Sequence, residues 1–170
     1  TRTPGLDAER RRQVGDAVAL LDRLERDHRG DAEVQGLFVR GMLGVADFRV
    51  AMGEHQVALA TLDRVDAVLA AAAAARAPEL ATVVGRVTAL LCRGKVLADL
   101  GRLVEAERCW QDAVALGDGV EASRRPPELE LPVAKCHGDL GRLAQMRGDF
   151  DEAVRHLELR LAGETRLAAD

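Results

Sequence analysis

The side chains that could carry out catalysis or metal binding are few in this sequence. The single serine, Ser123, lies in the segment VEASRRPP, which lacks the GxSxG turn that presents a nucleophilic serine to its base. Cys136, His137 and His156 form a cysteine and histidine group, but no HExxH or CxxC spacing supports a metal site there. We expect a buried thiol and two ordinary helical histidines, and we predict no catalytic residue, no metal ion and no cofactor. A metal-dependent enzyme acting around His137 and His156 is an alternative hypothesis.

Clusters of charged residues are explained by helix ends and solvated helix faces. Asp149, Asp151 and Glu152 lack the sequence of a calcium-binding loop, and carboxylates at a helix start are stabilised by free amides and the helix dipole. Arg10–Arg12 and Arg124–Arg125 are short basic runs, which are typical of solvated surfaces. The formal net charge of −4 gives no attraction to phosphate backbones or anionic lipids. We therefore predict no nucleic-acid partner and no membrane partner.

The composition favours helices as the elements that hold these side chains. Hydrophobic residues make up 48% of the chain and are mainly Ala, Leu and Val, whereas aromatic residues, which are enriched in strands, make up 2%. Asparagine is absent, so the Asn-Gly turns of β-hairpins are missing. The sequence therefore predicts an all-α protein.

A repeat with a spacing of 48 and then 47 residues runs through the chain, marked by Gly53, Gly101 and Gly148. Each glycine is preceded at seven residues by a small residue and followed at five by an alanine and at nine by a bulky apolar residue. In that order, these residues are Ala46, Gly94 and Gly141, then Ala58, Ala106 and Ala153, then Leu62, Trp110 and Leu157. Glycine adopts the left-handed conformation that ends one helix and turns the chain into the next. The pattern predicts helix hairpins closed by an apolar stripe.

This pattern resembles the tetratricopeptide repeat, in which a small residue, a turn glycine, an alanine and a large apolar residue recur at these offsets. The resemblance is clearest in VLADLGRLVEAERCWQDAVAL (Val96–Leu116) and LGRLAQMRGDFDEAVRHLELRL (Leu140–Leu161), and weaker in RVAMGEHQVALATLDRV (Arg49–Val65). The spacing exceeds the usual period of about 34 residues, as in extended variants found in bacterial regulators. The resemblance implies a right-handed superhelix of antiparallel helix hairpins, with about seven helices.

Capping residues and periodicity predict where the elements begin and end. The expected segments of a single domain over residues 1–170 are a lone first helix over 6–29 and hairpins over 32–77, 78–117 and 127–168. Pro78 and Pro127 suit the first turn of a helix, where proline loses no hydrogen bond. Because Thr1 is not an initiator methionine and the last residues keep a helical pattern, we expect a piece of a longer protein.

The resemblance also implies that the chain binds other proteins. In the family, the first helix of each hairpin lines a concave groove that holds peptides or neighbouring domains. The matching positions here are Arg40, Leu43, Asp47, Thr88, Leu91, Lys95, Asp99, Lys135, Arg142 and Gln145. Cations outnumber acids in this set, so we expect the groove to prefer an acidic segment. The alternative is that these positions are ordinary solvated ones.

We therefore predict a non-catalytic interaction and regulatory scaffold domain of a bacterial signalling protein, which recognises a protein segment or an adjoining domain of the same chain. The three cysteines form no CxxC pair, which favours reduced thiols and a cytoplasmic location. The alanine run of residues 70–75 is a candidate homodimer face. A small-molecule-sensing domain that controls a C-terminal output module, such as a diguanylate cyclase or a DNA-binding domain, is the alternative hypothesis.

Overall fold

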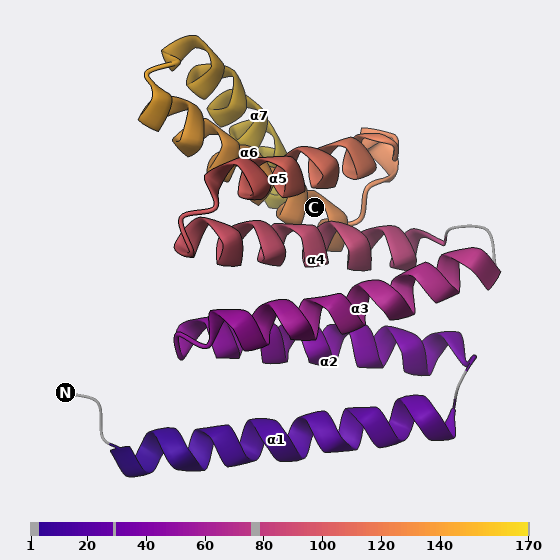
Figure 1. The fold of residues 1–170 in the computed structure, drawn as a ribbon. Coiled ribbons are helices and arrows are strands. Elements are labelled where there is room, and N and C mark those ends of the chain that lie inside the picture. The colour runs from indigo at the N-terminus through magenta and orange to yellow at the C-terminus, as the bar shows by residue number, and fades with distance from the viewer. Residues whose placement is uncertain (1–3, 29, 76–78, 170) are drawn as a thin grey trace. The chain divides into compact units, whose positions relative to one another are not determined.

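The computed structural model describes residues 4–28, 30–75 and 79–169, and the regular elements in these ranges are all helices. They are α1 (Pro4–Asp27), α2 (Ala32–Ala51), α3 (His55–Ala75), α4 (Leu80–Asp99), α5 (Leu103–Asp118), the short 3₁₀-helix η1 (Ala122–Arg124), α6 (Pro127–Arg147) and α7 (Phe150–Ala169) (Figure 1). The predicted all-α class, with about seven helices that form hairpins, is confirmed. Pro127 lies in the first turn of α6, as expected, whereas Pro78 lies outside the described residues.

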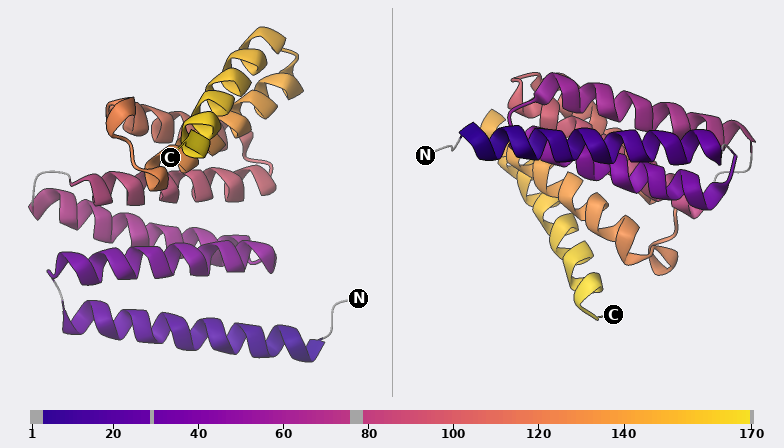
Figure 2. Two further views of the ribbon diagram at one scale, coloured as in Figure 1. Left: turned by 180° about the vertical axis from the view of Figure 1, so that it is seen from behind. Right: turned by 90° about the horizontal axis from the view of Figure 1, so that it is seen from below.

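Contacts between helices divide the chain into two compact units, residues 1–75 and 76–170. In the N-terminal unit, α2 and α3 form an antiparallel hairpin and α1 packs along α2 (Figures 1 and 2). In the C-terminal unit, α4 pairs with α5 and α6 pairs with α7, and α6 also contacts both α4 and α5. The division falls between two hairpins, so each hairpin lies within one unit. A continuous domain over residues 1–170 stays a prediction.

The three repeat glycines form the same turn in all three hairpins. Gly53, Gly101 and Gly148 have φ angles of 77°, 76° and 81°, in the left-handed region that a side chain would strain. In each turn, the N–H after the glycine donates to the carbonyl five residues back, over 2.8 Å in the first two turns and 3.0 Å in the third. This bond and the one from the glycine N–H satisfy the carbonyls at the helix end. The predicted equivalence of the three turns is confirmed.

The small residues before each turn let the paired helices approach closely. A Cβ added to Gly94 on α4 would lie 2.2 Å from Nε1 of Trp110 on α5, so the indole occupies the space that a side chain would fill. A Cβ on Gly141 of α6 would lie 3.2 Å from the carbonyl oxygen of Ala153 and 3.5 Å from Cγ of Leu157 on α7. Trp110 is 4% exposed, which confirms that it belongs to the stripe between helices.

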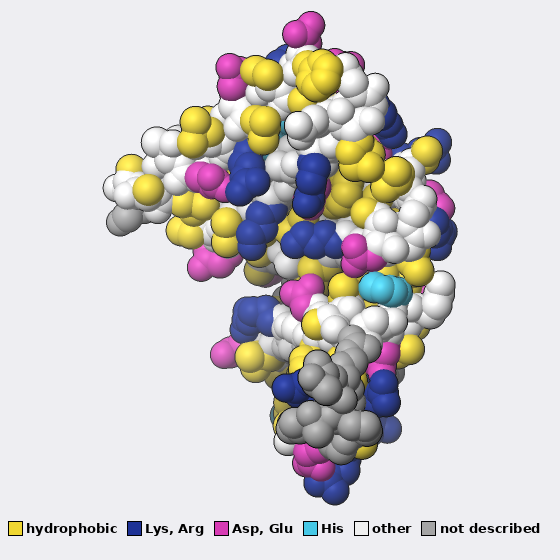
Figure 3. Space-filling model, turned by 90° about the vertical axis from the view of Figure 1, so that its left-hand side faces the viewer, with side chains coloured by type: hydrophobic (Ala, Val, Ile, Leu, Met, Phe, Trp, Pro, Cys, Tyr) yellow, Lys and Arg dark blue, Asp and Glu magenta, His cyan; other side chains and the backbone are white. Residues whose placement is uncertain are grey.

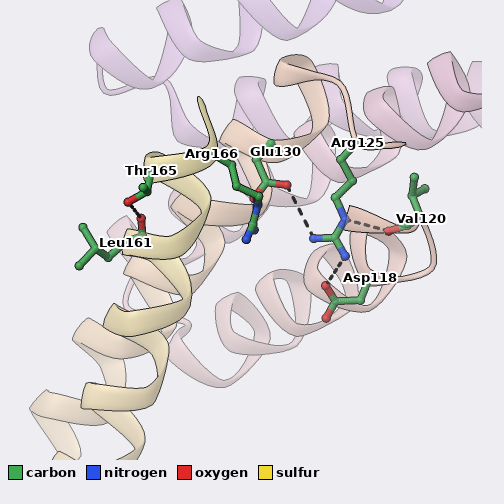
Figure 4. Close-up of polar contacts among 7 residues, drawn as sticks. All are labelled: Asp118, Val120, Arg125, Glu130, Leu161, Thr165 and Arg166. Carbon is green, nitrogen blue, oxygen red and sulfur yellow. Dashed lines mark hydrogen bonds and ion pairs between the residues drawn. The ribbon is translucent and has the colours of Figure 1, made fainter. Parts of the chain in front are cut away.

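A buried carboxylate joins α6 to α7 and to the segment before α6. Glu130 is buried, and its Oε1 accepts hydrogen bonds from the guanidinium of Arg166 on α7. Its Oε2 lies 3.8 Å from Nη1 of Arg125. The same guanidinium donates through Nε to the carbonyl oxygen of Val120 over 2.8 Å, and through Nη2 to Oδ1 of Asp118 over 2.9 Å (Figure 4). The two arginines offset the cost of burying the carboxylate. The pairs fix residues 118–126 against the last hairpin.

Replacing Gly94 with alanine should destabilise the protein by about 1–3 kcal/mol, because the new methyl group overlaps the Trp110 indole and one helix must shift. Urea denaturation followed by circular dichroism measures the change. Gly44→Ala is the matched control, since Gly44 lies within α2 and a Cβ there meets no atom within 4 Å. That control should stabilise by up to about 1 kcal/mol through helix propensity. Equal destabilisation by both variants would contradict the packing argument.

Replacing Glu130 with alanine should destabilise the C-terminal unit by about 3 kcal/mol, because the largely buried guanidinium of Arg125 then loses a nearby negative charge. Fluorescence of Trp110, the one tryptophan of the chain, follows unfolding of this unit. Glu105→Ala, which removes the carboxylate of the exposed Arg102–Glu105 pair, is the control and should leave stability nearly unchanged. Similar losses in the two variants would show that the buried pairs add nothing specific.

Candidate functional site

Five of the predicted binding residues lie exposed on two contacting helices of the C-terminal unit. They are Lys95 and Asp99 on α4 and Lys135, Arg142 and Gln145 on α6, and we call them the α4–α6 surface. The charge of Lys95 on α4 acts on the thiol of Cys136 on α6, so Lys95 lies near this part of α6. Figure 3 shows a face of the C-terminal unit on which Lys and Arg side chains gather.

Asp139 belongs to this region and is not among the residues predicted from the sequence. It lies one turn before Arg142, and its Oδ1 accepts a hydrogen bond from the Arg142 guanidinium. The carboxyl group is buried, and its Oδ2 has no hydrogen-bond partner among the described residues. Burial, together with the charge of Asp139, raises the pKa of Cys136 to about 12, so this thiol stays protonated. The three-residue spacing of Asp139 and Arg142 on a helix is the signal that could have identified the pair.

The other predicted residues are not part of the α4–α6 surface. Leu43 and Leu91, which were expected to line a groove, are buried in the core instead, because apolar side chains at these positions pack against neighbouring helices. Thr88 is half-buried, and its hydroxyl donates to the carbonyl oxygen of Val84 over 2.8 Å. Arg40 and Asp47 are exposed on α2 and belong to the N-terminal unit.

The α6–α7 hairpin brings His137 and His156 together. Their Nδ1 atoms are 3.1 Å apart, the distance of a hydrogen bond in which one ring donates and the other accepts. His137 is buried and His156 is partly buried, with Nε2 of His156 lying 3.9 Å from Oε1 of Glu152. The pair therefore links the last two helices.

Burial is the main cause that lowers the pKa of both histidines. For His137, the charges of His156 and Arg125 lower it further, while Asp118 and Glu130 oppose the shift. For His156, Glu152 opposes the shift and Arg155 adds to it. A histidine with a lowered pKa binds fewer protons in the folded state than in the unfolded state. Its contribution to stability is complete above the unfolded pKa and is lost as the pH falls through the folded value.

The described residues offer neither a metal site nor a membrane-spanning helix. Residues 4–28, 30–75 and 79–169 contain no group of three or more His, Cys, Asp or Glu arranged to hold a metal ion. The helices there also lack the combination of length and hydropathy that a membrane-spanning segment has. Cys92 and Cys136 are buried, and Cys109 is partly buried.

Lowering the pH from about 7.5 to about 5.5 should destabilise the C-terminal unit, because the unfolded histidines take up protons at about 6.5 and the folded pair takes them up only at lower pH. Urea midpoints followed by Trp110 fluorescence at the two pH values measure this loss. The double variant His137→Gln with His156→Gln keeps neutral polar side chains and should show a smaller pH dependence. An unchanged difference between the two midpoints in that variant would assign the effect to other groups.

Comparisons with known proteins support the repeat pattern. The sequence model of the tetratricopeptide repeat matches residues 87–112 and residues 134–158. No protein with a curated description matches the chain. Among solved structures, BtubC (BKLC) from P. vanneervenii matches with a TM-score of 0.72 and 19% sequence identity, over 93% of this chain and 58% of that one. At this identity the likeness shows the fold alone, and the chain spans 58% of the length of BtubC.

Each of the two matched segments lies within one helix hairpin. Residues 87–112 hold Gly94, Gly101 and Trp110, and residues 134–158 hold the equivalent Gly141, Gly148 and Leu157. Each segment consists of most of one helix, a left-handed glycine turn and the start of the next helix. Residues 87–112 and 134–158 are therefore tetratricopeptide repeats.

Proposed function

We propose that this chain is a non-catalytic interaction and regulatory scaffold domain that binds an acidic segment of a protein partner, or of an adjoining domain, on the α4–α6 surface. Tetratricopeptide repeats generally mediate protein–protein interactions. The observation that carries the proposal is the placement of Lys95, Lys135 and Arg142, which are exposed on the first helices of two consecutive repeats. Side chains on two contacting helices present their charges to one extended segment.

The chemistry of the α4–α6 surface favours carboxylates as the groups that it recognises. The surface carries three cations and two carboxylates, the exposed Asp99 and the buried Asp139. Complementary charge on a partner determines which partner binds and in which register. Asp139 holds the Arg142 guanidinium in one orientation, which lowers the conformational entropy lost when Arg142 binds a partner. The amide of Gln145 adds a donor and an acceptor for the backbone of an extended peptide.

The biological setting that we propose is a signalling protein in the cytoplasm of a bacterium. The lack of a CxxC pair among the three cysteines supports a reducing compartment. A composition rich in Ala, Val, Gly and Arg supports a bacterial source.

Reversing both lysine charges should weaken binding of an acidic partner by at least about tenfold, because each substitution replaces attraction by repulsion at the contact. The probe is a short fluorescein-labelled peptide rich in Asp and Glu, titrated against the protein and against Lys95→Glu with Lys135→Glu, with anisotropy as the readout. The affinity for the unchanged protein should also fall with added salt.

The control variant for this experiment has the same net charge, but its two substitutions lie outside the α4–α6 surface. Arg108→Glu with Arg155→Glu alters two exposed cations on α5 and α7, and it changes the net charge by the same amount. This control should bind the acidic peptide about as well as the unchanged protein. Equal loss in both double variants, or equal binding of a matched Lys-rich peptide, would reject the α4–α6 surface as the site.

A further inference from the structure

One side of α7 presents a row of exposed apolar side chains. The row consists of Phe150, Val154, Leu157 and Leu161, which are 65%, 53%, 50% and 64% exposed. Their spacing of four, three and four residues places them along a single face of the helix. Ala153 and Gly163 are the residues through which α7 is buried, so the α7 row lies beside the contact with α6. A contiguous apolar patch of this kind marks an interaction site more often than chance exposure does.

The preceding repeat shows what covers the equivalent face. Residues 47 positions before the α7 row are Leu103, Glu107, Trp110 and Val114 on α5, and each of them is buried or half-buried. The α5 helix is covered by α6, since Glu107 accepts two hydrogen bonds from Arg147, over 2.7 and 2.6 Å. At the other end, a Cβ on Gly117 would lie 2.3 Å from Val133. The end of α6 thus meets the start of α5, and the two helices are antiparallel.

The charges beside the α7 row define the partner further. Asp151 and Glu158 are exposed and lie one turn before and one turn after Val154, along one edge of the row. On the other edge, the Arg160 side chain lies over Gly138 of α6 and donates to Glu164 over 2.8 Å. A helix placed on the row therefore meets carboxylates along its open side. Basic residues on that helix would complement them, as Arg147 complements Glu107 on α5.

We propose that the α7 row binds an amphipathic helix of a partner protein, which lies antiparallel to α7 in the way that α6 lies on α5 and carries basic residues opposite Asp151 and Glu158. The apolar face of that helix covers Phe150, Val154, Leu157 and Leu161. This site is separate from the α4–α6 surface, and it recognises an opposite charge. Its occupant buries apolar area and adopts helical structure on binding.

The probe is a fluorescein-labelled synthetic peptide with leucines at the i, i+3, i+4 and i+7 positions of a helix and lysines along one edge. It is titrated against the full chain, and anisotropy and the circular dichroism of the peptide are recorded. We expect saturable binding with a gain of helix. A matched peptide with glutamates in place of the lysines should bind more weakly by at least about tenfold, because it meets Asp151 and Glu158.

Two leucines of α7 provide a matched pair of variants. Leu161→Glu places a charge on the row and should weaken binding by at least about tenfold. Leu159→Glu makes the same change at a leucine that is 50% exposed on another face of the same helix, and it should change the affinity by less than about twofold. Asp151→Lys with Glu158→Lys should reverse the preference so that the glutamate peptide binds better.

Several results would overturn the proposal. Loss of binding in Leu159→Glu as large as in Leu161→Glu would mean that the peptide binds apolar surface without a defined site. Absence of binding to the unchanged chain would reject a partner helix. A concentration-dependent dimer in analytical ultracentrifugation, abolished by Leu161→Glu and not displaced by the lysine peptide, would assign the row to a second copy of this chain. The acidic-peptide titration of the α4–α6 surface is unaffected by these outcomes, so the two sites succeed or fail separately.

Discussion

The close approach of paired helices at Gly94 and Gly141 is the constraint on which the C-terminal unit depends. A side chain at either position would displace Trp110 or the backbone of α7, so the register of each hairpin is fixed by the absence of two Cβ atoms. The left-handed glycines at the turns fix where the second helix begins relative to the first. Together these two features determine which side chains of each helix are buried and which are left for other contacts.

The α6 helix packs against α5 and α7 and leaves two cations exposed. Gly138 and Gly141 face α7, Val133 packs against α5, and Lys135 and Arg142 remain exposed. The charges of the α4–α6 surface are therefore placed by the packing of the glycines on another side of the same helix.

The parts of this structure that sequence predicts are those set by short-range rules. The glycine turns, the alanine at five residues and the bulky residue at nine are encoded within one hairpin, so their spacing reveals them. The burial of Leu43 and Leu91 could not be read in this way, because helical periodicity gives a position on a helix and not the neighbour that covers it. The pairing of Glu130 with Arg166 joins residues 36 apart in sequence, and it exists because α7 folds back along α6.

Leu157 and Trp110 occupy equivalent places in the repeat, yet one is half exposed and the other is buried. The difference does not lie in their own hairpins, since both lie over the glycine of the paired helix. The difference in exposure arises on the face of each helix that points away from that glycine. On α5 this face is covered by α6, whereas on α7 it has no covering helix among the described residues. The same repeat position therefore holds a core residue, Trp110, in one repeat and a residue of the proposed binding row, Leu157, in the next. The α7 helix packs against α6 on one side and offers the proposed binding row on the other.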